Sequence, residues 1–165
     1  MRGCINRKVE LSEENYDLLD EVIHQLCEQG RLLEEQNAMQ HGSTSVYEHS
    51  VNVAYKSLLL VENYRLPVDK QSLVRGALLH DYFLYDWHEK DGGHRLHGFR
   101  HPAFALYNAS KDFSLNRKER NIIARHMFPL TVLPPRCLEA WIVCFVDKYC
   151  AFSETMGDGR IQWER

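Results

Sequence analysis

The stretch RGALLHDYFLYDWH, from Arg75 to His88, places a histidine and an aspartate side by side where an apolar run ends. The apolar residues before this pair recur at helical spacing, so we expect a helix that ends near His80 and Asp81. Ionisable groups seldom stand at the inner end of a hydrophobic segment unless each has a partner, because burying an unpaired charge costs free energy. The partners of His80 and Asp81 must therefore come from other parts of the chain.

The composition predicts one globular domain that does not bind a nucleic-acid polymer. The chain has 165 residues, 44% of them hydrophobic, which allows a core that buries roughly 70% of the surface of the unfolded chain. Its 20 basic and 23 acidic residues are mixed along the whole length and give a net charge of −3. Duplex binding needs a concentrated basic stripe, so we expect no polymeric nucleic acid as partner. A nucleotide is not excluded by this pattern.

No segment is expected to enter a membrane. The start, MRGCINRKVELSEEN, lacks the apolar stretch of a signal peptide, and no segment approaches the length that spans a bilayer, so we expect a cytoplasmic protein. In a reducing compartment, cysteines without a C-x-x-C pair pack as small hydrophobic residues and form neither disulfides nor a zinc knuckle. We expect this of all five, which are Cys4, Cys27, Cys137, Cys144 and Cys150.

Helical periodicity dominates the chain. Apolar residues recur at spacings of three and four almost throughout, and few runs alternate with period two, so we predict an all-α domain of about six helices. Capping signals support several helix starts, such as Ser45 with Glu48, and Asp69. His101 precedes Pro102, a residue favoured in the first turn, and is expected at an N-cap. The expected helices cover about 13–29, 46–63, 69–81, 102–109, 116–128 and 134–152, with a shorter one over 32–40.

One aspartate stands inside the most apolar helix. The segment AWIVCFVDKYCAF, Ala140 to Phe152, is apolar nearly all round, which is typical of a buried helix. Asp147 lies in this segment, where an unpaired carboxylate is costly or takes up a proton. It therefore needs a cation or several hydrogen-bond donors. A buried arginine, Arg75 or Arg125, is one alternative, and a metal ion is the other.

Histidines on core-facing helix positions make the same demand. His49 shares an apolar helix face with Val53, and His126 shares one with Ile122. Taken alone, such a histidine is more often a hydrogen-bonded core residue than a ligand. Together with the histidine and aspartate of the opening stretch and the buried aspartate, however, they indicate one shared metal site. Imidazoles with carboxylates suit divalent Mn, Fe, Co, Ni or Zn, whereas the lack of cysteine ligands argues against a structural zinc site.

The order of these residues resembles a known family. The pattern H…HD…H…H…D on successive helices is similar to the HD superfamily of metal-dependent phosphohydrolases, in the variant whose two extra histidines support a second metal. The resemblance covers about Val46 to Phe152. It implies an all-α fold with the metal centre between helices. We accordingly expect a single HD-like domain over 1–165, with its core at about 46–152 and an N-terminal helical segment over 1–44.

The resemblance also implies ligands for two divalent transition-metal ions. One of these ligands is His101, and His97, four residues earlier in the chain, is the alternative to it. The implied ligands are His49, His80, Asp81 and Asp147 for the first ion, with Asp81 bridging to a second ion held by His101 and His126.

The polar segment DWHEKDGGHRLHGFR, Asp86 to Arg100, begins just after the HD pair and ends at the next implied ligand. Connections of this length in compact domains are often functional, so we expect this one to shape access to the metals. Asp86 either orients the water, protonates the leaving group or only caps the loop. The basic residues near the implied ligands either contact the substrate or are simply solvated at the surface. The candidates are Asp81, Asp86 and Lys148 in catalysis, and His94, His97, Arg100 and Arg125 in substrate binding.

The resemblance implies hydrolysis of a small phosphate ester or anhydride by a hydroxide that the metals activate. A nucleotide is the favoured substrate class, because binuclear members that cleave dinucleoside polyphosphates keep the same six ligands. Other branches carry glycine and lysine, or glutamate, just after the HD pair, where this chain has Tyr82, Phe83 and Leu84. Their substrates therefore do not transfer. A di-iron oxygenase and a non-catalytic regulatory or binding module are the alternatives, and oxygen consumption would identify the former.

Overall fold

The computed structural model describes residues 10–41, 44–82 and 97–156. Within these ranges the chain forms six α-helices, one 3-10 helix (η1) and a pair of short antiparallel strands, which confirms the predicted all-α fold. The elements are α1 (Glu13–Gln29), η1 (Leu32–Asn37), β1 (Met39–His41), β2 (Thr44–Ser45), α2 (Val46–Tyr64), α3 (Lys70–Leu78), α4 (His97–Asp112), α5 (Arg117–Arg125) and α6 (Leu138–Thr155).

Side-chain caps fix where α2, α3 and α5 begin. The Glu48 N–H donates to Ser45 Oγ (3.2 Å) and the Ser45 N–H donates to Glu48 Oε2 (2.9 Å), the reciprocal pair of a capping box. A capping box also opens α5 at Asn116, and the side chain of Asp69 caps α3. Each cap satisfies an amide that helix geometry leaves without an intrahelical partner. These predicted helix starts are confirmed.

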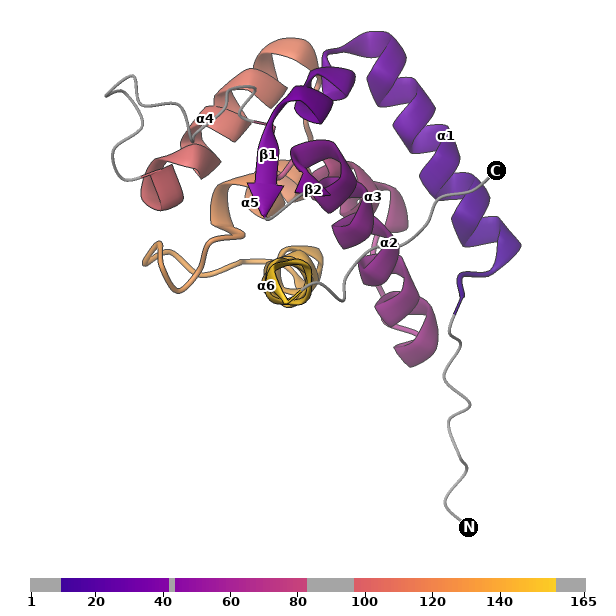
Figure 1. Ribbon diagram of the computed structural model, residues 1–165. Helices are drawn as coiled ribbons and strands as arrows, with labels where there is room; N and C mark the ends of the chain where they lie inside the picture. Colours follow the sequence, from indigo (N-terminus) through magenta and orange to yellow (C-terminus); the bar gives the residue numbers. More distant parts are fainter. Residues whose placement is uncertain (1–9, 42–43, 83–96, 157–165) are drawn as a thin grey trace.

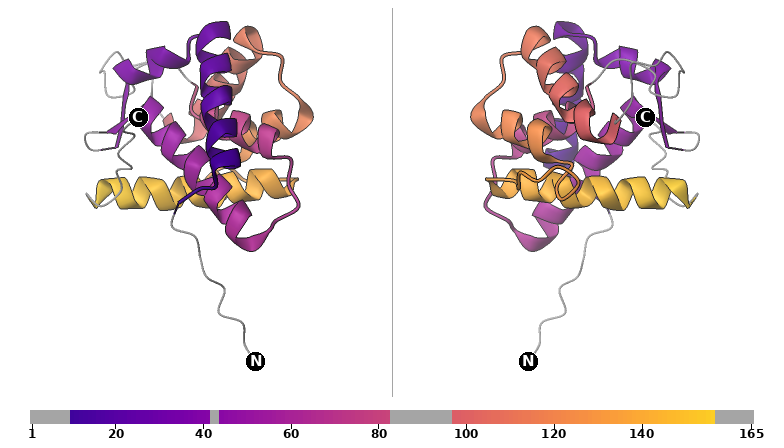
Figure 2. Two further views of the ribbon diagram at one scale, coloured as in Figure 1. Left: turned by 90° about the vertical axis from the view of Figure 1, so that its right-hand side faces the viewer. Right: turned by 90° about the vertical axis from the view of Figure 1, so that its left-hand side faces the viewer.

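Helix α2 lies at the centre of the bundle. It packs against α3, α6 and η1, while α5 packs against α3, α4 and α6. Figure 1 looks along α6, and Figure 2 shows the same helix at full length, crossing the lower part of the bundle. The core therefore lies where α2, α3, α5 and α6 meet. Its buried apolar side chains include Leu58, Val61, Leu73, Leu78, Ile122, Ile123, Val143 and Val146.

The segment before α2 differs from its prediction. The helix expected over 32–40 is a 3-10 helix that ends at Asn37, after which β1 pairs with β2. The hairpin reverses the chain and delivers it, in extended conformation, to the Ser45 N-cap. A continuous helix over 32–40 would have left too few residues for this reversal, and short-range periodicity does not reveal such a constraint.

The boundaries of α3 and α4 also differ. Helix α3 ends at Leu78, so His80 and Asp81 lie in the turn that follows it. Helix α4 begins at His97, which places His101 inside the helix and corrects its expected position at the N-cap. Pro102 lies in the second turn of α4, where it costs one backbone hydrogen bond but does not end the helix.

The sequence predicted that α6 is buried all round, and this prediction is wrong. It lies at the side of the bundle, so only one of its faces packs against α2 and α5. The opposite face carries exposed apolar side chains, namely Leu138 (41% exposed), Phe145 (63%), Tyr149 (61%) and Phe152 (67%). Asp147 lies on the buried face and is only 7% exposed.

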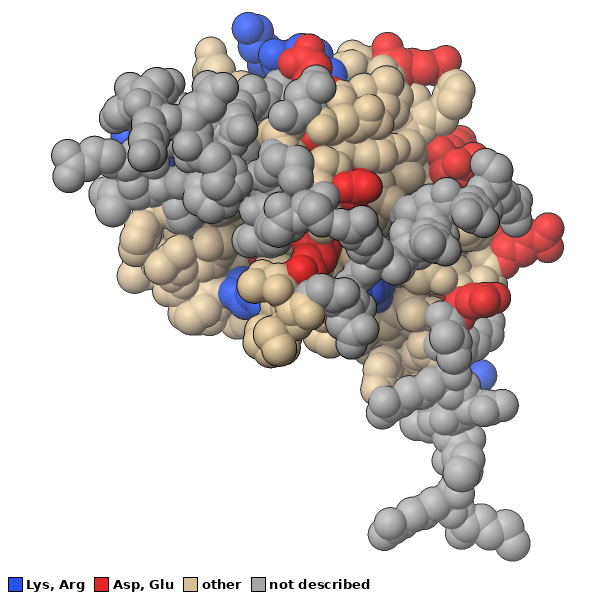
Figure 3. All heavy atoms as spheres, viewed as in Figure 1, with Lys and Arg blue, Asp and Glu red and all other residues tan. Residues whose placement is uncertain are grey.

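Charge is unevenly spread over the face that Figure 3 shows. The face in Figure 3 carries acidic side chains along its right edge, where α1 lies, and few lysines or arginines among the coloured residues. Helix α1 contains acidic residues from its first turn onward and no basic residue in its last turn.

None of the helices in the described ranges combines the length and hydropathy that crossing a membrane requires. The four cysteines in these ranges are unpaired thiols, as expected.

Helices α3 and α5 approach closely at a glycine, which provides a test of the packing. A Cβ atom at Gly76 would lie 3.0 Å from Cβ of Ile122 and closer still to its Cδ1. Gly76→Ala should therefore lower the free energy of unfolding by about 1–3 kcal/mol, despite the better helix propensity of alanine. Urea denaturation measures this change. Ile122→Val removes the Cδ1 methyl, so the double variant Gly76→Ala/Ile122→Val should be more stable than the sum of the two single effects predicts. If the two effects simply add, residues 76 and 122 are not in contact.

Candidate metal centre

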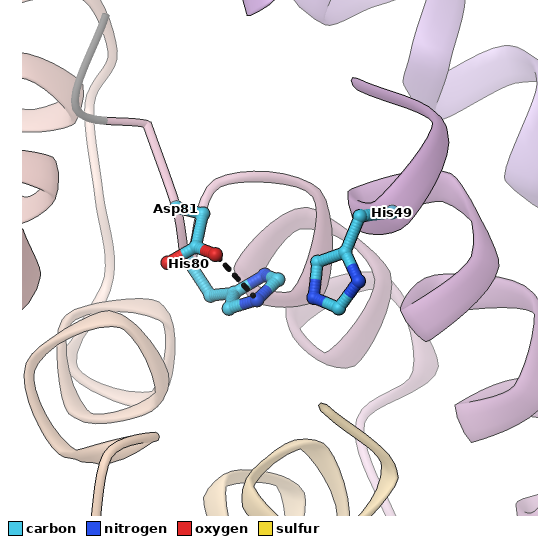
Figure 4. Close-up of side chains that lie close together, drawn as sticks. All are labelled: His49, His80 and Asp81. Carbon is cyan, nitrogen blue, oxygen red and sulfur yellow. Dashed lines mark ion pairs between the residues drawn. The ribbon is translucent and has the colours of Figure 1, made fainter. Parts of the chain in front are cut away.

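Six side chains singled out in the sequence meet in one buried place. None of them is more than 7% exposed. Figure 4 shows two of the imidazole rings and a carboxylate facing a common space between α2 and the turn after α3. The six are His49 on α2, His80 and Asp81 after α3, His101 on α4, His126 at the C-terminus of α5, and Asp147 on α6.

A first group of donor atoms surrounds Asp147. Its Oδ1 lies 3.1 Å from His49 Nε2 and 3.6 Å from His80 Nε2. His80 Nε2 in turn lies 3.5 Å from Asp81 Oδ2. Two imidazole nitrogens and two carboxylate oxygens thus face one another from three different elements.

A second group lies on the other side of Asp81. Its Oδ1 is 3.2 Å from His101 Nε2 and 3.4 Å from His126 Nε2, and the two imidazole nitrogens are 2.8 Å apart. The two oxygens of Asp81 therefore belong to different groups. This is the arrangement that a carboxylate bridging two ions requires.

Hydrogen bonds made by Nδ1 of His80 and of His126 indicate that Nε2 of each ring is an acceptor. His80 Nδ1 donates to the Ala77 carbonyl oxygen (2.7 Å), and His126 Nδ1 donates to the Ile123 carbonyl oxygen (2.9 Å). In a neutral imidazole the other nitrogen, Nε2, then carries a lone pair. His80 Nε2 has no hydrogen-bond partner among the described residues although it is fully buried. The Nε2 lone pairs of His80 and His126 therefore both face Asp81.

The donor set fits divalent metal ions. An ion bound at about 2.0–2.2 Å by each ligand brings neighbouring ligand atoms to about 3.0–3.5 Å of one another. The separations within the two groups run from 2.8 Å to 3.6 Å. Imidazole and carboxylate donors without thiolates suit Mn, Fe, Co, Ni or Zn, and do not discriminate among them. The sequence prediction of one shared metal centre is thus geometrically sound, and the number and identity of the ions stay predictions.

Electrostatics at the first group show how strongly it demands positive charge. Burial alone would lower the pKa of His49, but hydrogen bonds with Asp147 and Glu154 raise it to about 10. Burial alone would raise the pKa of Asp147, but His49 and His80 hold it well below its usual range. A proton on His49 thus supplies, in the metal-free protein, positive charge that a bound ion would otherwise provide.

The remaining predicted residues are placed differently. Lys148 Nζ donates to the His126 carbonyl oxygen (2.7 Å) and lies 4.0 Å from Asp147 Oδ2, so it borders the centre. Arg125 Nη1 donates to the Pro134 carbonyl oxygen, and the Arg100 guanidinium lies over the ring of Phe104. Both of these contacts are with residues outside the two donor groups. Asp86 and His94 lie outside the described residues, and His97 opens α4 but its side chain is not described.

Sequence reasoning missed a buried glutamate near the centre. Glu35 on η1 is 1% exposed, and neither of its carboxyl oxygens has a hydrogen-bond partner among the described residues. Burial, and then the charge of Asp81, raise its pKa well above the usual range, with His49 opposing the shift. The sequence LLEEQN gives no sign that Glu35 is buried while its neighbour Glu34 is exposed.

Replacing Glu35 with glutamine should stabilise the metal-free protein as the pH rises. A carboxyl whose pKa is raised by folding favours the folded state below its unfolded pKa, and this contribution is lost as the pH rises through the folded pKa. Glutamine does not titrate, so the variant should gain little near pH 4 and progressively more toward pH 8. Urea unfolding of chelator-treated protein across that range is the measurement. Exposed Glu34→Gln is the control, and a pH-independent difference for Glu35→Gln would contradict the burial of an ionisable group.

Comparison with known proteins agrees with the donor geometry. The family model "HD domain" matches residues 46–151, a segment that contains all six side chains of the two groups. Neither a curated protein nor a solved structure matches the chain. The matched segment covers well over half of the sequence. The chain therefore belongs to the HD domain family.

Proposed function

We propose that the protein is a metal-dependent phosphohydrolase whose centre binds two divalent ions. Family membership supports the class, because HD domains are generally metal-dependent hydrolases. The buried donor groups support the metal requirement. In the proposed centre, His49, His80, Asp81 and Asp147 would hold one ion. Asp81, His101 and His126 would hold the other.

The observation that supports this most directly is the convergence of imidazole nitrogens on the two oxygens of Asp81. A purely structural cluster would pair each buried acceptor with a donor, because an unpaired buried polar group is costly. Here the Nδ1–H groups of His80 and His126 are used on backbone carbonyls, so that in their neutral forms both rings turn an Nε2 lone pair toward Asp81. Divalent cations relieve this conflict and protonated imidazoles do so only in part.

The proposed chemistry divides between the ions and the chain. Bound divalent ions polarise a phosphoryl oxygen and lower the pKa of a nearby water to about 7. The chain keeps the donors in place through the outward hydrogen bonds of its imidazoles. Lys148 adds a positive charge beside Asp147, where it can offset the charge of a bound phosphate. Arg100 and Arg125 stay proposed substrate-binding residues.

The substrate class in this proposal is a small phosphate ester or anhydride, with nucleotides first. The segment from Asp86 to Arg100 begins five residues after Asp81 and ends directly before His101, so both of its ends are close in sequence to the proposed centre. Asp86 is the proposed group that orients water or protonates the leaving group, and His94 and His97 are proposed to contact the substrate. Their alanine variants should change KM or kcat while sparing metal content.

Phosphate release should depend on the metal supplied. Metal-free protein, reloaded separately with Mn, Fe, Co, Ni, Zn or Mg, should cleave a panel of nucleotides and simple phosphate esters with at least one transition metal, and lose the activity again with a chelator. Phosphate release measures this. If no phosphate compound is cleaved with any metal, the hydrolase proposal fails. Oxygen consumption by the iron-loaded protein without phosphate release would favour the oxygenase alternative.

Asp147→Asn should damage the chemistry more than the fold. The amide keeps the shape of the side chain but removes the negative charge, so we expect loss of bound metal. We expect the activity to fall at least about 100-fold, because removal of a ligand should cost more than removal of a residue that only hydrogen-bonds to a ligand. Metal analysis, phosphate release and helical circular dichroism are the readouts. Asp69→Asn, at the α3 N-cap, is the control and should keep both metal and activity. Full metal content and full activity in Asp147→Asn would show that this residue is no ligand.

A further inference from the structure

We propose that Glu154 is a positioning residue that aligns His49 for metal binding by accepting the hydrogen on its Nδ1. The inference rests on the metal centre proposed above and extends it. Glu154 Oε2 lies 2.8 Å from His49 Nδ1, and both side chains are fully buried, at 0% exposure. Because a carboxylate accepts from an N–H group, this contact places the hydrogen on Nδ1. Nε2 is then the atom that faces Asp147, 3.1 Å away.

The position of His49 explains why it uses a side chain as its acceptor. His80 and His126 donate to backbone carbonyls in the last turns of α3 and α5. The last carbonyl groups of a helix have no intrahelical partner and are available. His49 is the fourth residue of α2, where the carbonyls of its own turn accept from amides further along the helix. Its acceptor must therefore come from another element, and α6 supplies it.

Asn52 fixes the second oxygen of the same carboxylate. Its Nδ2 donates to Glu154 Oε1 at 3.0 Å, and it follows His49 by three residues, on the same side of α2. Glu154 follows Asp147 by seven residues, which places both carboxylates on the buried face of α6. One face of α6 thus contacts both nitrogens of the His49 imidazole, and Asn52 holds the outer carboxylate in register.

This arrangement should strengthen His49 as a ligand. A carboxylate on the outer nitrogen fixes the tautomer and the ring orientation and raises the basicity of the opposite nitrogen; losing it costs about 10- to 100-fold in metal affinity. Glu154 lies beyond the segment 46–151 that the family model matches, so family membership does not assign this role. The support acts on the first group, because the contact is with His49, which belongs to that group.

Cobalt(II) titration of metal-free protein tests the role. Glu154→Gln keeps the shape and a carbonyl oxygen but removes the charge. Calorimetry and the visible absorption of the bound ion should show one binding step weakened by about 10- to 100-fold, while the step at His101 and His126 stays unchanged. Asn52→Ala removes one donor to Oε1 but keeps the contact to His49, so it should weaken the same step by a smaller factor. This variant also serves as the test if Glu154→Gln does not fold.

Glu139 provides the matched control. It is a second buried carboxylate on α6, and it accepts from Lys118 Nζ at 2.6 Å and from the Asp69 N–H at 3.0 Å, away from the centre. Glu139→Gln should leave both cobalt(II) steps unchanged even if it lowers stability. Equal cobalt(II) affinity of the wild type and Glu154→Gln, or equal losses in Glu139→Gln and Glu154→Gln, would overturn the inference and leave the proposed function standing. A wild type that binds no cobalt(II) would overturn both.

Discussion

The buried carboxylate of Asp81, set between two groups of imidazoles, is the constraint on which the centre of this fold depends. Burial would raise the pKa of Asp81, but His80 and His101 hold it well below its usual range. An anion thus remains in the core, at 1% exposure, and its surroundings have to supply positive charge. Protons on the imidazoles provide part of this charge, and divalent ions between the donor atoms would provide all of it.

Helix ends and one close helix contact bring the donors together. His80 and His126 follow the last turns of α3 and α5, where free carbonyls accept their outer hydrogens. Gly76 and Ile122 each stand four residues before one of these histidines, so the tight contact between the helices lies one turn below the paired rings. The two ring centroids are 4.9 Å apart. Packing in the apolar core therefore controls the spacing of the polar centre.

The sequence predicted what depends on local pattern. Periodicity and capping residues such as Ser45 and Asp69 gave the helices. His49, His126 and Asp147 were conspicuous as polar residues in apolar helical segments, whereas His101 was implied as a ligand only by the family resemblance. What depends on tertiary packing was not predictable. Glu154 meets His49 across more than one hundred residues of sequence, and nothing local distinguishes buried Glu35 from its exposed neighbour. The exposed stripe of α6 shows the same limit, because an apolar pattern does not state which faces have a partner.

The most direct test of the central claim is the anomalous diffraction of crystals grown from protein loaded anaerobically with a single transition metal. Two anomalous peaks should appear, one bounded by His49, His80 and Asp147 and the other by His101 and His126, with one Asp81 oxygen on each. A single peak in the first group would restrict the account to one ion. Fully loaded crystals without any peak at these side chains would contradict the metal centre itself.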